Sequence, residues 1–289
     1  MAMTERVNVE PNSDAWLIAR QSGVGASEVA SLVGTSPYMG PRTLYHQKRG
    51  EIEPTPPSLA MRVGSLVEPV VASLLADDLS VSMRLQPGMF RRADAHHHLA
   101  SIDAAIDDER LAELKMTSER SATDLKDGPF PHWLDQAQWQ MHVTGAAVVI
   151  FGVLIGNRDF RTWHVMRNDT RIDELRDAVD AFWKRVQDGD APSHTDADQD
   201  GLRRVRPAGA SIALSETSVQ RWKLAERLED HAKGVQKRVA RLKSAVLDEI
   251  GTASVAVLDE TYEIRRSTQT RKSYTVAEKV IITTRKAKR

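Results

Sequence analysis

The sequence predicts an α/β protein with a mixed central β-sheet flanked by helices, followed by a C-terminal helical extension. An apolar run at residues 146–155, AAVVIFGVLI, is typical of a strand that is buried on both faces. Shorter alternating runs occupy residues 81–116, and a helix over residues 131–144 lies between the two, which makes a strand–helix–strand unit. Residues 1–200 carry 20 basic and 30 acidic side chains, whereas residues 201–289 carry 20 and 10, which indicates two parts with different roles.

The composition excludes several classes of protein. The 289 residues are 41% hydrophobic and 28% charged, values typical of soluble globular proteins. No stretch approaches the roughly 20 apolar residues that span a bilayer, so we expect no membrane association. Cysteine is absent, which excludes disulfides, Cys-ligated metals, Fe–S clusters and a thiol nucleophile. The N-terminus is polar and charged without an apolar signal region, so we expect a cytoplasmic protein.

Capping and helix-breaking residues predict the helices of the N-terminal half. Asn12 or Ser13 caps a helix that runs to Arg20, and glycines then separate it from a short helix over residues 27–33. Pro41 begins another helix, which ends just before a glycine, the asymmetry that helices usually show.

Three more elements complete the predicted core. Ser58 caps a long helix that runs to about Asp77, with Pro69 as a kink inside it. Residues 160–166 predict a further strand, and residues 169–187 have the apolar stripe of an amphipathic helix. We therefore expect a long helix before the sheet and another after it.

A change of composition predicts the domain boundaries. We expect a core over residues 1–188, a polar linker over residues 189–210, and a long helix with a basic extension over residues 211–289. The long helix carries apolar residues with heptad spacing, at Ala225, Leu228, Ala232, Val235, Val239, Leu242 and Val246. Such a seam needs a partner surface, which is the chain's own body, a second copy or another protein.

The candidate chemistry lies in a predicted β-hairpin over residues 99–115, LASIDAAIDDERLAELK. If the turn is centred on Asp108, residues whose numbers add to 216 face each other across the two strands. Asp103 then lies opposite Glu113, and Ser101 lies opposite Lys115. Because side chains alternate along a strand, all four project from one face.

Two opposed carboxylates repel each other unless a positive charge lies between them. Carboxylate oxygens suit Mg²⁺ or Mn²⁺, so Glu113 would hold the metal and Lys115 would reach the attacking water or the scissile phosphate. Glu68, on the preceding long helix, adds a third carboxylate. The helix that follows the hairpin offers three glutamines, at Gln136, Gln138 and Gln140. The alternative interpretation of the Asp and Glu-x-Lys spacing is a solvated strand with alternating charges.

Other conspicuous residues favour plainer interpretations. We expect His96, His97 and His98 to be surface residues, because successive residues cannot all face one ion from a regular element. The two tryptophans of the 131–144 helix are expected in the core. The basic residues 203–206 and the terminal RKAKR are either phosphate contacts or solvated charges.

Five ordered sequence blocks between residues 16 and 166 resemble a known family. They are WLIARQSGVGASEVASLVGTSPY, LYHQKRG, GSLVEP, ASIDAAID with LAELK, and WLDQAQWQMHVTG. The chain resembles the YqaJ-like viral recombinase family, the phage lambda exonuclease-like branch of the PD-(D/E)XK nucleases. The resemblance implies a restriction-endonuclease-like core and a deoxyribonuclease that uses Mg²⁺ or Mn²⁺.

The resemblance also assigns roles to individual residues. It implies metal ligands at Glu68, Asp103, Glu113 and the backbone carbonyl of Leu114, a catalytic lysine at Lys115, and a catalytic glutamine at Gln138. It implies contacts to the terminal phosphate at Arg20, Ser27 and Ser101, with a further arginine at Arg120. Taken alone, Arg20 also suits an exposed helix end and Ser27 a helix cap.

The chain departs from the family pattern at two places. Ile102 and Ala104 flank Asp103 where the family commonly has Pro and Gly, and Met116-Thr117 replaces a Cys-Pro after the lysine. These changes alter local turn geometry but keep the carboxylate and the ammonium.

The implied function is a 5′-to-3′ exonuclease that digests one strand of linear double-stranded DNA and leaves 3′ overhangs for strand annealing. The implied partners are DNA ends, a phage single-strand annealing protein, and further copies of the chain in a trimeric ring inside a bacterial host. Two alternatives stay open. One is a single-strand or RecB-type exonuclease or an endonuclease of the same superfamily, and the other is a non-catalytic DNA-binding scaffold.

Overall fold

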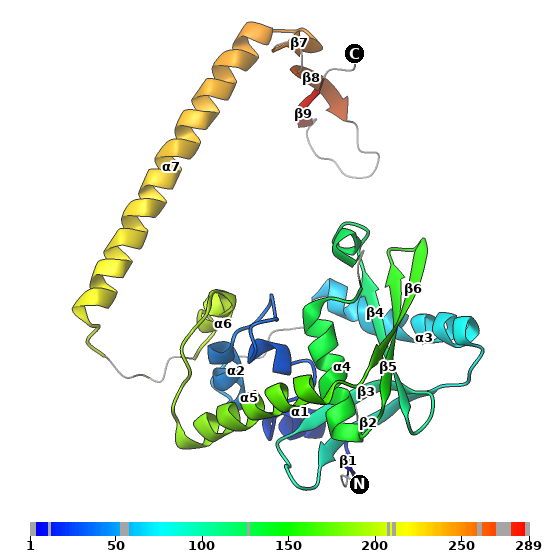
Figure 1. The fold of residues 1–289 in the computed structure, drawn as a ribbon. Helices are drawn as coiled ribbons and strands as arrows, with labels where there is room; N and C mark the ends of the chain where they lie inside the picture. Colours follow the sequence, from blue (N-terminus) through cyan, green and yellow to red (C-terminus); the bar gives the residue numbers. More distant parts are fainter. Residues whose placement is uncertain are drawn as a thin grey trace. The chain divides into compact units, whose positions relative to one another are not determined.

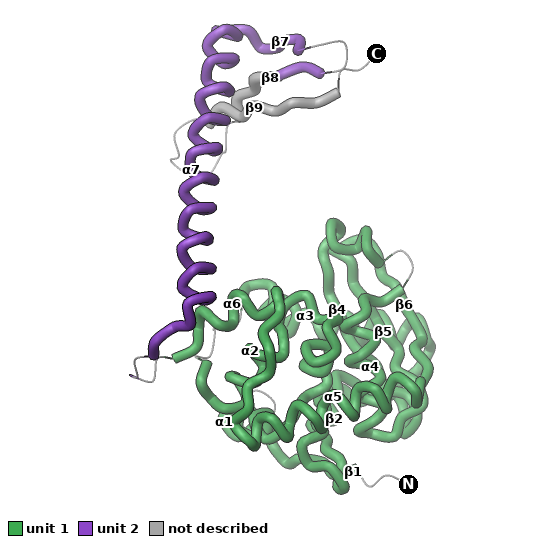
Figure 2. The backbone as a smooth tube through the Cα atoms, turned by 60° about the vertical axis from the view of Figure 1, so that its left-hand side comes forward, with its two compact units in different colours: residues 1–208 green, residues 209–289 purple. Residues whose placement is uncertain are grey.

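The computed structural model describes residues 4–10, 13–52, 58–125, 128–206, 209, 212–258, 262–269 and 279–286. The chain divides into two compact units, residues 1–208 and residues 209–289 (Figure 2).

A six-stranded mixed sheet is the centre of the first unit (Figure 1). Its strands lie side by side in sequence order: β1 (Thr4–Val7), β2 (Arg84–Arg92), β3 (Leu99–Ala105), β4 (Arg110–Thr117), β5 (Val148–Ile155) and β6 (Asp159–Met166). Every neighbouring pair is antiparallel except β4 and β5, which are parallel and joined through helix α4 (Pro131–Thr144). The predicted strand–helix–strand unit and the α/β fold class with a mixed sheet are confirmed.

Helices cover both faces of this sheet. Helix α3 (Leu59–Leu79) packs Val71, Ala72 and Leu75 on inward residues of β3, β4 and β5. On the other face lie α4, α5 (Asp169–Asp188), α2 (Pro41–Lys48) and the 3-10 turn η1 (Val29–Ser31), which share the larger apolar core with the alternate residues of the strands. The central strands are therefore buried on both sides, which is why β5 has a continuous apolar sequence.

The predicted helix caps are present. The Ser13 side chain accepts a hydrogen bond from the Trp16 backbone N–H at the start of α1 (Asp14–Gln21), and Ser58 caps α3 in the same way. Pro69 lies inside α3 as expected. Two details differ from expectation: the helix predicted over 27–33 is only the single turn η1, and strand β1 was not predicted. The sequence of β1 is polar, and its pairing with β2 makes it a strand.

Helix α3 is long and apolar enough to cross a membrane by length and composition alone. No stretch of this kind was expected from the sequence. The helix also carries Glu68 and Pro69 near its middle, and it packs on the sheet through part of its surface.

The first unit continues past the helix α5. Residues beyond it form the 3-10 turn η3 (Asp196–Asp198) and the short helix α6 (Gln199–Leu202). The Asp198 carboxylate is fully buried and accepts hydrogen bonds from the backbone N–H groups of Thr43 and Thr195, at 2.7 and 2.8 Å. This stretch is thus packed against α2, and the division at 188 and 210 stays a prediction about separate roles.

The second unit consists of one long helix and a small sheet. Helix α7 (Glu216–Ile250) has 35 residues, is capped by Ser215, and ends at Gly251, as the heptad pattern predicted. The antiparallel strands β7 (Val255–Val257), β8 (Tyr262–Gln269) and β9 (Lys279–Lys286) follow. The expected strand near 253–258 is confirmed, and the last residues of the basic RKAKR end lie outside the described residues.

Candidate active site

The β3–β4 hairpin has the register that the sequence predicts. Ala104 pairs with Ala112 and Ala105 with Leu111, so paired residue numbers add to 216. One residue further from the turn, the Asp103 carboxylate accepts a hydrogen bond from the Leu114 backbone N–H at 3.0 Å. The Asp103 side chain therefore lies against the β4 backbone, beside Glu113.

A pocket of about 260 Å³ gathers most of the predicted site residues. Those that line it are Arg20, Ser27, Glu68, Ser101, Asp103, Glu113, Leu114 and Lys115. They come from α1, the loop after it, α3, β3 and β4, so five separate segments contribute to one cavity. Trp16, Met89 and Gln136 are among its other lining residues.

Among the three carboxylates of this pocket, Glu113 is the most deeply buried, with 1% of its surface exposed. The Lys115 ammonium lies 2.6 Å from its Oε1 atom, which also accepts a hydrogen bond from the Gln136 amide. Its Oε2 atom accepts a hydrogen bond from the Gln140 amide at 2.5 Å. Both oxygens therefore have donors, and Gln136 Oε1 in turn accepts a hydrogen bond from Lys115 at 3.3 Å.

The electrostatics of the pocket show a shortage of positive charge. Burial, and then the nearby Glu113, raise the pKa of Asp103 to about 8, against the opposing effect of Lys115. Burial also raises the pKa of Glu68, with a smaller contribution from Glu113. Burial alone would lower the pKa of Lys115, but Glu113 and Asp103 outweigh it and raise that pKa. Three carboxylates thus share one ammonium, an arrangement that suits a divalent cation.

The structure corrects the prediction for the catalytic glutamine. Gln138 points away from the pocket, because its amide donates to the Met166 carbonyl and its oxygen accepts from the Asn168 N–H, both at 2.8 Å. Residues four apart share a helix face, whereas residues two apart do not. Gln136 and Gln140 are therefore the glutamines that α4 directs toward Glu113.

Arg120 is also placed apart from the pocket. It is exposed in the turn between β4 and the 3-10 turn η2 (Ser121–Leu125) and does not line the cavity. The altered sequence after Lys115, Met116-Thr117, forms the end of strand β4.

A second ionic cluster borders the pocket on the side of α1. The Glu28 carboxylate lies 3.0 Å from Arg20 Nη2 and 2.7 Å from Lys48 Nζ, and it accepts a hydrogen bond from the Gly25 N–H at 2.7 Å. Burial would raise the pKa of Glu28, but Lys48 and Arg20 outweigh it and hold that pKa at about 2. The same Arg20 nitrogen lies 3.4 Å from Ser27 Oγ. Glu28 thus holds Arg20 and the loop backbone in place.

Sequence reasoning missed three residues of this region, namely Trp16, Glu28 and Lys48. The Arg20 guanidinium carbon lies 4.8 Å from the centre of a Trp16 ring. A signal for Trp16 existed, because it is four residues before Arg20 and shares its helix face. No local pattern pairs Glu28 with Lys48, because they lie on different elements.

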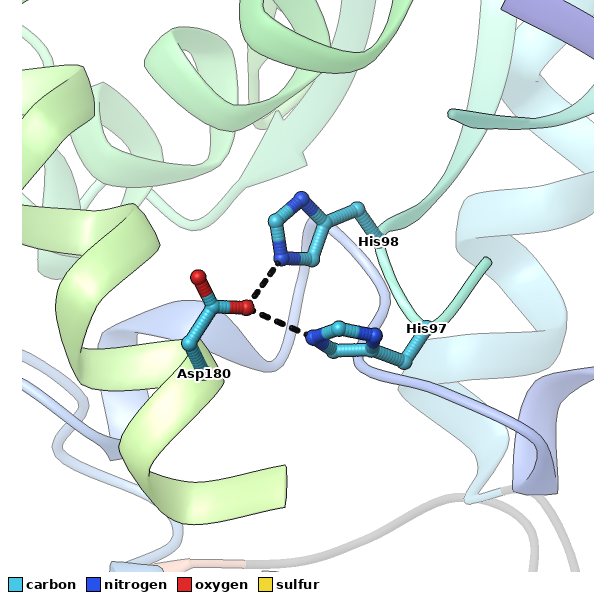
Figure 3. Close-up of side chains that lie close together, drawn as sticks. All are labelled: His97, His98 and Asp180. Carbon is cyan, nitrogen blue, oxygen red and sulfur yellow. Dashed lines mark hydrogen bonds and ion pairs between the residues drawn. The ribbon is translucent and has the colours of Figure 1, made fainter. Parts of the chain in front are cut away.

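His97 and His98, two residues of the histidine triplet, hold the same loop against α5. His97 Nε2 and His98 Nε2 lie 2.6 and 2.8 Å from Asp180 Oδ1 on α5 (Figure 3). His98 is 1% exposed, so the prediction of a surface position is wrong for it, and burial lowers its pKa to about 4. The backbone on either side of His98 exchanges hydrogen bonds with Val24, at 2.7 and 3.0 Å. These contacts tie the loop that carries Gly25 to α5.

Part of the chain is similar in sequence to known proteins. Residues 15–147 match the YqaJ-like viral recombinase domain. The chain is 30% identical over 192 residues to the protein YqaJ of Bacillus subtilis (strain 168), a match that covers 64% of this chain and 60% of that relative. The chain therefore matches less than two thirds of the length of that relative.

The fold resembles a solved nuclease. The alkaline exonuclease LHK-Exo from Laribacter hongkongensis superimposes with a TM-score of 0.53 at 21% identity, over 61% of this chain and 94% of that one. Its complex with dAMP gives a TM-score of 0.54 at the same identity and coverage. At this identity the likeness shows a shared fold, which is restriction-endonuclease-like. Residues 15–147 of this chain are therefore similar in sequence to the YqaJ-like viral recombinase domain, and the fold is similar to that of an alkaline exonuclease.

Proposed function

We propose that this protein is a metal-dependent 5′-to-3′ exonuclease that digests one strand of linear double-stranded DNA and leaves 3′ overhangs. The observation that carries the proposal is the single pocket in which Asp103, Glu113 and Lys115 meet Arg20 and Ser27. One half of the pocket suits phosphodiester hydrolysis, and the other half suits an anionic strand end. The domain family and the fold shared with an alkaline exonuclease support this assignment.

The residues present fit a hard divalent cation such as Mg²⁺ or Mn²⁺. Asp103, Glu113, Glu68 and the Leu114 carbonyl would hold it, and burial together with the nearby Glu113 raises the pKa of Asp103. When bound, such a cation would neutralise phosphate charge and lower the pKa of a water molecule, which makes that water a better nucleophile.

The protein's own groups position the reactants. The Lys115 ammonium orients the attacking water and offsets charge that develops on the phosphate. Gln136 contacts both Lys115 and Glu113, so it keeps the two side chains at a set separation. Gln140 anchors the second Glu113 oxygen from the same helix face.

The other side of the pocket would receive the 5′ phosphate. Arg20 supplies a charged fork, of which Nη2 is held by Glu28, and Ser27 and Ser101 supply hydroxyls. The Trp16 ring beside Arg20 offers a flat apolar surface to the terminal nucleotide. An anchored terminal phosphate on one side and hydrolysis on the other would determine the direction of digestion.

The proposal extends to partners through the family resemblance. We expect a single-strand annealing protein to receive the 3′ overhangs, and a ring of three copies to enclose the duplex. A phage or prophage protein acting in the cytoplasm of a bacterial host fits this role.

The decisive experiment compares DNA substrates with and without Mg²⁺. We expect the purified chain to digest end-labelled linear duplex bearing a 5′ phosphate, to leave closed circles intact, and to stop in EDTA. Faster digestion of single strands, or cutting of circles, would assign it to another nuclease class. Binding without any cleavage in Mg²⁺ or Mn²⁺ would overturn the proposal in favour of a DNA-binding scaffold.

A further inference from the structure

Helix α7 carries an apolar seam that the second unit leaves uncovered. The seam consists of Ala225, Leu228, Ala232, Val235, Val239, Leu242 and Val246, with alternating spacings of three and four residues. Among the described residues of α7 none is buried, and Leu228 and Leu242 are 58% and 62% exposed. At 1.5 Å per residue, the seam runs for about 33 Å along the helix. A stripe of this length is typical of a helix that pairs with another helix.

The sizes of the seam residues favour an antiparallel pair of identical helices. In a parallel pair each residue faces itself, so Ala232 faces Ala232 and leaves a gap, and β-branched Val235 occupies a d position that favours Leu in dimers. In an antiparallel pair whose facing residue numbers add to 474, Ala232 faces Leu242, Val235 faces Val239, and Leu228 faces Val246. Each of these layers combines a larger with a smaller side chain, or two valines, and Ala225 lies beyond them, opposite Glu249.

The charges beside the seam favour the same orientation. In the antiparallel register Glu229 flanks Lys243 of the other helix, and the two-fold symmetry makes this attractive pair twice, against one repulsive contact of Arg238 with its own copy. In a parallel pair, Arg238 at a g position would instead flank Lys243 at the next e position, which sets two positive charges together. Size and charge thus point to one arrangement.

We propose that α7 binds α7 of a second copy of this chain as an antiparallel two-stranded coiled coil centred near residue 237. This contact goes beyond the proposed nuclease function, because it involves the second unit alone. It joins two copies through their C-terminal units, whatever assembly the first units form.

The first test removes the seam in the full-length protein. Leu242→Asp and Val235→Asp place a charge in the interface, so we expect sedimentation to show an assembly of half the wild-type mass. Ser244→Asp, on the opposite side of the helix, is the matched control and keeps the wild-type mass. Equal masses for the wild-type and the two seam variants would overturn the proposal.

The second test determines orientation, and it uses the absence of cysteine from the chain. An equal mixture of the Leu228→Cys and Val246→Cys proteins is expected to form a disulfide-linked dimer on oxidation, whereas Leu228→Cys alone is not. A parallel pair would give the reverse, with Leu228→Cys linking to itself. No linkage in either sample would show that no second copy lies on the seam.

The third test uses charge reversal. Lys243→Glu faces Glu229 in the antiparallel pair, so we expect self-association to weaken about fivefold at low salt, and Glu229→Lys combined with it to restore the affinity. In a parallel pair the same Lys243→Glu would face Arg238 and strengthen association. A strengthened or unchanged pair would contradict the proposed orientation.

Discussion

Two buried ionic clusters lie within the first unit. Cations outnumber carboxylates in one, and carboxylates outnumber cations in the other. At Glu28, one carboxylate is shared by two cations, Arg20 and Lys48, and its pKa falls to about 2. Around Asp103, three carboxylates share the single ammonium of Lys115, and the pKa of Asp103 rises to about 8. A buried charge with partners serves the structure, whereas a buried charge without enough partners indicates a site where another cation belongs.

The largest expected effect concerns Lys115, whose ammonium lies among the three carboxylates around Asp103. Lys115→Ala removes the group that orients the water and offsets phosphate charge, so we expect cleavage of linear duplex to fall by at least about 100-fold. DNA binding, measured by fluorescence anisotropy, is expected to stay close to that of the wild type. Lys184→Ala on the exposed face of α5 is the control, because among the described residues Lys184 pairs with Asp188 alone, at 2.6 Å. Undiminished digestion by Lys115→Ala would exclude the proposed mechanism.

The second prediction compares how one substitution in each cluster changes the free energy of unfolding. Glu28→Gln leaves the Lys48 ammonium buried without its carboxylate, so we expect the free energy of unfolding to fall by about 3–5 kcal/mol. Asp103→Asn removes a carboxyl group whose ionisation folding suppresses, so we expect unchanged or increased stability together with loss of cleavage. Urea unfolding in EDTA measures both. A strongly destabilised Asp103→Asn protein would mean that the two clusters play the same structural role.

The third prediction is the pH dependence of stability in the metal-free protein. The pKa of Asp103 is raised on folding, so the folded state keeps a proton that the unfolded state loses, and this group makes stability fall as pH rises from about 4 to about 8. The pKa of Glu28 is lowered, so its contribution is present above pH 4.5 and is lost as pH falls toward 2.

Thermal unfolding between pH 4 and pH 9, in EDTA and in Mg²⁺, measures this pH dependence of stability. We expect the alkaline decline in EDTA to be smaller in Asp103→Asn and to be reversed by Mg²⁺, because cation binding requires the deprotonated carboxylate. An alkaline decline of equal size in Asp103→Asn would show that another group causes it.

The smallest expected effects distinguish the glutamines of α4. Gln136→Ala frees Lys115 and Glu113 from their shared partner, so we expect kcat to fall about tenfold with little change in stability. Gln138→Ala leaves the Asn168 N–H and the Met166 carbonyl without their partner, so we expect a loss of about 1–2 kcal/mol and no specific loss of kcat. Single-turnover cleavage and urea unfolding separate the two. The opposite pattern would restore Gln138 as the catalytic glutamine.

Local patterns along the chain were sufficient to predict the hairpin register and the ends of several helices. Alternation around the turn at Asp108 was enough to predict the register in which Ala104 pairs with Ala112 and Asp103 lies against β4, because register in a short hairpin follows from the turn. Capping residues and glycines likewise placed α3, α4 and α7, because helix ends depend on neighbours in the chain.

Which of the local candidates face the pocket depends on how distant segments of the chain pack together. Gln136, Gln138 and Gln140 are alike in sequence, and the docking of α4 on the sheet selects the first and the third. Glu28 finds Lys48 on another helix, and polar β1 becomes a strand only beside β2. Side-chain direction on a helix depends on the surface it packs against, and pairing between distant segments leaves no periodic trace in the sequence.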